Sequence, residues 1–184
     1  IFHEYVHFVI KNNFQTSILP VWLNEGLAEY FQTFHLKNER KAIFGEAQKN
    51  HLRLLRQYNP VSLQTLSTID YESLAQMDSD KKNLFYVQSW AVTHYLMRKN
   101  GGLLNARIKN YLALISENKS PETAFEEAFD AAYKEVETNL DIYISKSFFK
   151  SDEINFSEKL NFETHLETEP ISKAAWLNYL GDLL

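Results

Sequence analysis

Apolar residues recur at helical spacing along most of the chain, and this pattern predicts a mainly α-helical fold. Proline and Ser-Pro signals mark several helix starts, while Asn and Gly-Gly signals mark helix ends. The pattern predicts helices over 1–11, 20–36, 39–57, 61–67, 84–99, 103–116, 120–130 and 133–149.

Three segments of this pattern carry further expectations. The helix over 1–11 is apolar on nearly all sides except His3, Glu4 and His7, which predicts a buried helix. Gly45 is unfavourable within the first half of the helix over 39–57. The polar run 78–83 is interpreted as a loop.

Beyond residue 150 the composition becomes polar and acidic, and the period is lost. We interpret 151–170 as a linker with one short strand at 160–166, and 171–184 as a further helix. Trp176 and Leu180-Gly181 resemble the opening helix of a TPR unit, although the spacing is one position too long. The alternative is a plain amphipathic helix. The domain organisation expected is a helical region over 1–150, the linker, and a possible start of a TPR region.

The composition excludes several classes of function. A net charge of −5 argues against an electrostatic nucleic-acid surface. The absence of cysteine removes disulfides, cysteine-bound zinc and thiol catalysis. No apolar run is long enough to span a bilayer. The chain starts without Met on a helix that carries chemistry, so we expect it to be a piece of a longer protein.

The first chemical signal is an H-E-x-x-H motif formed by His3, Glu4 and His7. On a helix, positions i and i+4 share one face, so two imidazoles can point at one metal ion. Imidazole is a good zinc ligand, and Glu4 can reach a metal-bound water without being a ligand itself.

A second element supplies the protein ligand that a catalytic zinc would still need. Glu25 follows His7 by 18 positions, and Glu29 lies on the same helix face. One carboxylate can bind metal, and the other can accept a hydrogen bond from the far nitrogen of a ligand imidazole. Their neighbours are mostly core residue types, so these carboxylates need partners. Gly26 would let another backbone approach this helix closely.

These two segments, His3 to His7 and Trp22 to Tyr30, resemble the gluzincin metallopeptidases. The resemblance is nearest to bacterial peptidase-MA-like domains, which TPR repeats often follow. It implies that residues 1–150 form the C-terminal helical part of a thermolysin-like domain whose β-sheet lies upstream of this chain. It also favours a bacterial protein that is extracytoplasmic or membrane-associated.

The resemblance further implies roles for individual residues. It implies zinc (Zn2+) as the cofactor, with His3, His7 and Glu25 as ligands and Glu4 as the general base. Glu29 would accept a hydrogen bond from His3, and Asn24 would help to hold the site.

Two residues are candidates for the donor that stabilises the oxyanion in peptide hydrolysis. Tyr86 has a placement similar to that of the catalytic tyrosine of zinc aminopeptidases, and His94 follows two turns later on the same predicted helix. A packed aromatic residue and a core histidine are the alternatives for the two. We interpret His35, His51 and His165 as surface or structural residues.

The function expected is therefore a zinc-dependent peptidase that acts on a peptide or protein substrate. One alternative is a zinc-binding but catalytically weak or inactive domain that serves protein interaction together with TPR repeats. Another is a helical TPR-type interaction module without chemistry, which would leave the placement of the histidines and carboxylates unexplained.

Overall fold

The computed structural model describes residues 2–13, 19–99, 106–146, 149–161 and 172–173. It confirms a mainly α-helical fold with a small antiparallel sheet. The elements are α1 (Phe2–Asn13), α2 (Val21–Phe31), β1 (His35–Asn38), β2 (Lys41–Phe44), α3 (Lys49–Gln57), α4 (Leu63–Thr68), α5 (Tyr71–Gln76), α6 (Ser79–Lys99), α7 (Ala106–Ser116), α8 (Pro121–Phe129), α9 (Tyr133–Ile144) and β3 (Asp152–Asn155).

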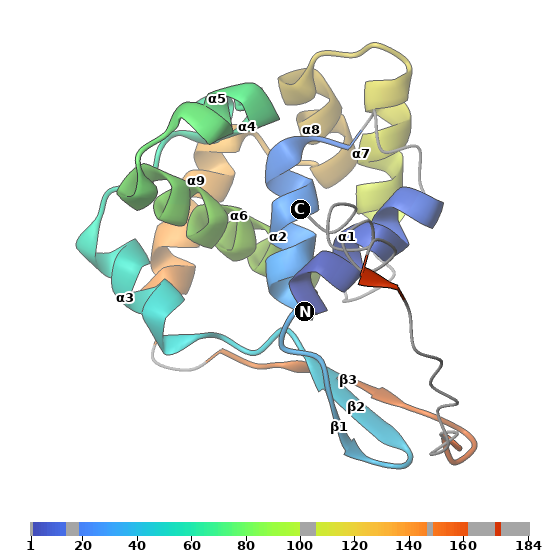
Figure 1. The fold of residues 1–184 in the computed structure, drawn as a ribbon. Helices are drawn as coiled ribbons and strands as arrows, with labels where there is room; N and C mark the ends of the chain where they lie inside the picture. Colours follow the sequence, from blue (N-terminus) through green and yellow to red (C-terminus); the bar gives the residue numbers. More distant parts are fainter. Residues whose placement is uncertain (1, 14–18, 100–105, 147–148, 162–171, 174–184) are drawn as a thin grey trace.

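Helices α2 and α6 form the centre of the molecule and pack against each other more extensively than any other described pair (Figure 1). Every residue of α6 from Val87 to Met97 is buried. At the crossing, a Cβ on Gly26 would overlap Thr93 Oγ1 and come within 2.5 Å of the Ser89 carbonyl oxygen. The expected role of Gly26 is therefore confirmed, because only glycine permits this approach.

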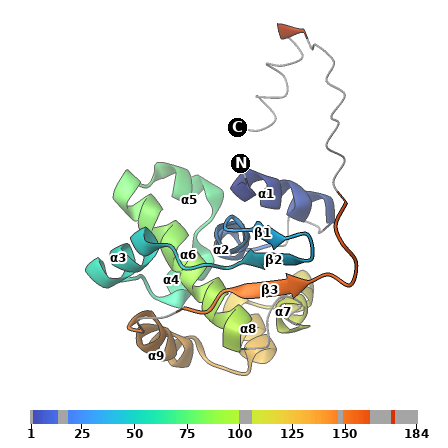
Figure 2. The same ribbon diagram turned by 90° about the horizontal axis from the view of Figure 1, so that it is seen from below.

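The three strands lie side by side in the order β1-β2-β3 at one end of the helices (Figures 1 and 2). All pairings are antiparallel, and β2 pairs with β3 across more than a hundred residues of sequence. Asp152 of β3 accepts hydrogen bonds from Tyr30 of α2 and Arg98 of α6. These contacts tie residues that were interpreted as linker to the central helix pair.

Two predicted helices are wrong over the hairpin. The helix expected over 20–36 ends at Phe31, and the first half of the helix expected over 39–57 is strand β2. Gly45 has a φ of 67°, which interrupts helical geometry before α3 begins. The short hairpin sequence has no strong strand signal of its own, so its partner β3 decides its conformation.

The segment before α6 is also more helical than predicted. The short helix expected over 61–67 is confirmed as α4, but α5 was not expected. The loop interpretation of 78–83 is wrong because α6 begins at Ser79. An aspartate caps the start of α5 and another the start of α6: Asp70 accepts a hydrogen bond from the Ser73 amide, and Asp78 accepts one from the Lys81 amide.

The sequence pattern predicted that helix α1 would be buried, and this prediction is wrong. Phe2, Tyr5 and Phe8 are all exposed, because among the described residues α1 packs mainly on α2 alone.

The later helices agree with the sequence pattern. Ser120 caps α8 and Pro121 opens it, as predicted. A strand is observed at Asp152–Asn155, where none was expected, and most of the strand expected at 160–166 lies outside the described residues. The helix expected over 171–184 also lies outside them, apart from 172–173. None of the helices in the described ranges has the length and hydropathy needed to cross a bilayer.

Candidate metal centre

Helices α1 and α2 bring three metal-ligand atoms together. His3 and His7 lie one turn apart on α1, and Glu25 faces them from the adjacent α2. The two Nε2 atoms are 3.1 Å apart, and Glu25 Oε2 lies 3.3 Å from His3 Nε2 and 3.2 Å from His7 Nε2. Within the described part of the chain, this is the one cluster of at least three His, Asp or Glu side chains whose ligand atoms lie close enough together to hold a metal ion.

The size of this triangle fits a tetrahedral zinc ion. Zinc bonds to histidine nitrogen and carboxylate oxygen are about 2.0–2.1 Å long, so tetrahedral ligands lie about 3.3–3.4 Å apart. The observed edges of 3.1–3.3 Å are close to this separation. His3, His7 and Glu25 would therefore fit as three of the four ligands that zinc takes.

Contacts on the far side of each imidazole leave its Nε2 free for a metal. His3 Nδ1 lies 3.2 Å from Glu29 Oε1, and His7 Nδ1 lies 3.2 Å from Asn24 Oδ1. Both partners accept hydrogen bonds, so the proton of each neutral imidazole resides on Nδ1. Once a metal replaces the second proton of each ring, both Nε2 lone pairs would be available to it, because such outer hydrogen bonds fix the ring tautomer in zinc sites.

The carboxylates also set the charge of the cluster in the metal-free protein. Hydrogen bonds with Glu25 and Glu29 raise the pKa of His3 to about 9, against the opposing effect of burial. Burial alone would lower the pKa of His7, but contacts with Glu25 and Asn24 outweigh it and raise this pKa. Burial would raise the pKa of Glu25, yet the two histidines lower it to about 2. A metal ion must therefore displace protons from the imidazoles.

The cluster opens into a pocket of about 360 Å³, which Asn24 also lines; Glu29 is not among its lining residues. Glu4 and Tyr86 line this pocket beside the metal-ligand atoms. The Tyr86 ring centre is 6.3 Å from that of His3. Lys11 lies at the pocket as well, one turn beyond His7. The arrangement places a carboxylate, a phenol and a cation around one candidate metal position.

The structure does not bring His94 to this pocket. Its side chain is fully buried in the core, where Nε2 donates to the Gly45 carbonyl at 2.9 Å and Nδ1 accepts from the Tyr143 hydroxyl at 2.7 Å. Burial lowers the pKa of His94 to about 4, so it is a neutral core histidine. His35 is exposed, as expected, and His165 lies outside the described residues.

Sequence analysis missed two residues at the centre. Tyr71 lines the pocket, donates a hydrogen bond to Glu25 Oε1 at 3.1 Å, and accepts one from Asn24. The N-cap signal Asp70-x-x-Ser73 would have placed Tyr71 at a helix start, but nothing in the sequence points that helix at Glu25. His51 was interpreted only as a surface or structural residue, and its Nε2 lies 3.3 Å from Glu29 Oε2.

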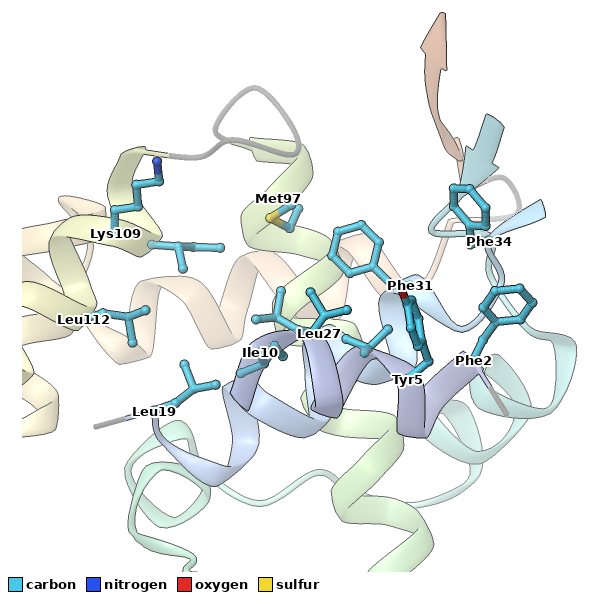
Figure 3. A pocket seen from close by; sticks show the side chains of 13 residues that line it. Phe2, Tyr5, Ile10, Leu19, Leu27, Phe31, Phe34, Met97, Lys109 and Leu112 are labelled. Atoms are coloured by element: carbon cyan, nitrogen blue, oxygen red, sulfur yellow. The ribbon is translucent and has the colours of Figure 1, made fainter. Parts of the chain in front are cut away.

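A larger pocket, of about 570 Å³, lies on the other face of α1 (Figure 3). Its lining from α1, α2, α6 and α7 is almost entirely apolar, with Lys109 beside it. None of the metal-ligand atoms reaches this pocket. Of these two pockets, the smaller one therefore holds the imidazoles and the carboxylates.

Comparison with known families gives one match. The family described as "Protein of unknown function (DUF1570)" matches residues 1–127, so the chain belongs to this family. The match includes α1, α2, α5 and α6, which contribute every residue of the pocket around the metal-ligand atoms. No curated protein and no solved structure matches the chain.

Proposed function

We propose that this chain carries the centre of a zinc-dependent peptidase. His3, His7 and Glu25 hold the ion, and Glu4 acts as general base beside it. The observation that carries the proposal is the triangle of ligand atoms with 3.1–3.3 Å edges, together with Glu4 in the same pocket. The resemblance of both segments to gluzincin peptidases supports the same assignment.

The proposed chemistry divides between the ion and the protein. Zinc, when bound, supplies Lewis acidity that activates a water molecule at neutral pH and polarises the substrate carbonyl. Glu4 takes the proton from the attacking water and passes it to the leaving amine. Tyr86 donates a hydrogen bond to the developing oxyanion.

The geometry supports separate roles for the two tyrosines of the pocket. The Tyr71 hydroxyl is already engaged with Glu25 and Asn24, so we assign it to holding these two residues in place. Tyr86 lines the pocket 6.3 Å from the His3 ring and is the better oxyanion donor. His94 is not proposed for that role because it is buried in the core.

The proposed substrate is a peptide or protein segment that enters the pocket beside α1. The experiment measures zinc content and hydrolysis of a mixed fluorogenic peptide library by the full chain. The wild-type protein should hold close to one zinc per chain. Glu4→Gln should lower hydrolysis by about 10²–10⁴-fold while zinc content stays unchanged.

Glu117→Gln serves as the matched control, since Glu117 is exposed and lies outside the pocket. It should keep both zinc and hydrolysis. Absence of zinc in the wild-type protein would refute the proposal. Zinc without any Glu4-dependent hydrolysis would instead favour a zinc-binding, catalytically inactive domain that serves protein interaction.

A further inference from the structure

His51 of α3 is a partly buried polar residue next to the metal-ligand cluster. Its side chain is 13% exposed and packs against Trp90 of α6, with ring centres 5.4 Å apart. Its Nε2 lies 3.3 Å from Glu29 Oε2. The other oxygen of the same carboxylate, Oε1, lies 3.2 Å from His3 Nδ1. Glu29 therefore stands between a candidate zinc ligand and a second histidine.

We propose that His51 is a positioning residue, which holds the Glu29 carboxylate so that His3 presents Nε2 to the metal. This inference rests on the zinc centre proposed above, but not on peptide hydrolysis. Gln32, the residue that caps the C-terminal end of α2, donates to the same Oε2. Oε2 is thus held from α2 and α3, which leaves Oε1 directed at His3.

The hydrogen-bonding state of His51 argues against a role in packing alone. Its Nδ1 is buried without a hydrogen-bond partner in the described structure. A buried nitrogen without a partner costs free energy that an apolar side chain of similar size would avoid. Burial also lowers the pKa of His51, so the ring is neutral and has a single N–H. The polar feature that His51 adds at this position is therefore one N–H donor, and its Nε2 lies 3.3 Å from Glu29 Oε2.

The orientation of Glu29 matters because this carboxylate selects the tautomer of His3. Loss of a hydrogen-bond partner on the outer side of a ligand histidine typically lowers metal affinity by about 10–100-fold. His51 acts one contact further out, so we expect an effect near the lower end of that range, about tenfold.

The test compares His51→Met with His51→Gln in the full chain. Met fills the space without a donor, whereas the side-chain amide of Gln places an N–H near the position of Nε2. Zinc affinity is measured by competition with a chelator, and the visible absorption spectrum is recorded with Co²⁺ in place of zinc. His51→Met should weaken zinc binding about tenfold and alter the Co²⁺ spectrum, and His51→Gln should restore most of both.

Two further variants isolate the contact. In a Glu29→Ala background, His51→Met should cause no additional loss of affinity, because the bridge is already absent. His35→Met is the matched control: His35 also faces a glutamate, Glu46, but at the exposed sheet edge. It should bind zinc as the wild type does.

The outcomes separate this inference from the proposed peptidase. Wild-type zinc affinity in His51→Met, or the same loss in the Glu29→Ala background, overturns the positioning role and leaves the peptidase intact. Zinc binding that depends on His51 but no hydrolysis overturns only the peptidase. A wild-type protein without zinc overturns both.

Discussion

Zinc affinity should depend steeply on pH, because the metal competes with protons for His3 and His7. The pKa of His3 in the metal-free protein is about 9, and that of His7 is also raised. With a pKa of about 9, half of His3 is deprotonated at pH 9 but only about one part in a hundred at pH 7. Protonation of His3 alone should weaken zinc binding about fifty-fold when the pH falls from 9 to 7.

The other ligand does not add to this dependence. Glu25 has a pKa of about 2 and stays ionised throughout the range. Protonation of His7 adds to the loss of affinity below its own raised pKa. The plot of log affinity against pH should therefore have a slope near one below pH 9 and a steeper slope at lower pH.

The stability of the metal-free protein should change in the opposite direction. A folded-state pKa of about 9 against an ordinary 6.5 means that His3 stabilises the fold most fully below pH 6.5. That stabilisation is lost as the pH rises through about 9. The contribution of His3 to the free energy of unfolding of the metal-free protein should thus be smaller at pH 9 than at pH 7.

The assay is competition with a chelator of known proton affinities at pH 6 to 9.5, paired with denaturant unfolding of the metal-free chain. Glu29→Gln removes one of the two carboxylates that raise the pKa of His3, so it should move the bend in the affinity curve to lower pH. Equal zinc affinities at pH 7 and pH 9 would refute the arrangement of His3 between Glu25 and Glu29.

Four substitutions test other parts of the structure. Gly26→Ala should destabilise the protein by about 1–3 kcal/mol in denaturant unfolding, because its Cβ meets the Ser89 carbonyl across the α2–α6 crossing. Tyr86→Phe should lower kcat by about 10²–10³-fold at unchanged zinc affinity. Tyr71→Phe should weaken zinc binding, since the Tyr71 hydroxyl donates a hydrogen bond to the proposed ligand Glu25. His94→Leu should cost about 1–3 kcal/mol of stability for each core partner left unpaired, without changing zinc affinity.

Each of these results has a clear contrary outcome. Unchanged stability of Gly26→Ala would contradict the close helix crossing. Loss of zinc in Tyr86→Phe would make that residue part of the support for the ligands, not an oxyanion donor. A change in zinc affinity in His94→Leu at unchanged stability would contradict its place in the core.

Much of the candidate site was predictable because it depends on helical spacing. His3 and His7 are four residues apart, and Glu25 and Glu29 are four residues apart, so each pair lies on one helix face whatever the surroundings. The role of Gly26 followed from its position on the same helix, and the structure confirms it. Residues that join the site from other helices, Tyr71 and His51, carry no comparable local signal.

The errors in the fold have the same origin. A short segment such as Lys41–Phe44 has little preference of its own, and its pairing with Asp152–Asn155 makes it a strand. His94 stands two turns after Tyr86 on one helix, so sequence spacing left both as candidates. The packing of α6 places Tyr86 at the pocket and His94 in the core.

The sequence by itself therefore determined the helical class, the pair of histidines on one helix, the pair of glutamates on the next, and the resemblance to zinc peptidases. These properties arise from contacts within one or two helical turns, where the backbone period alone sets the distances. Only the tertiary structure decided that the ligand atoms of His3, His7 and Glu25 lie 3.1–3.3 Å apart, that Tyr71 contacts Glu25, and that His51 contacts Glu29. Those distances depend on how α1, α2, α3 and α5 pack, which is a property of the whole core.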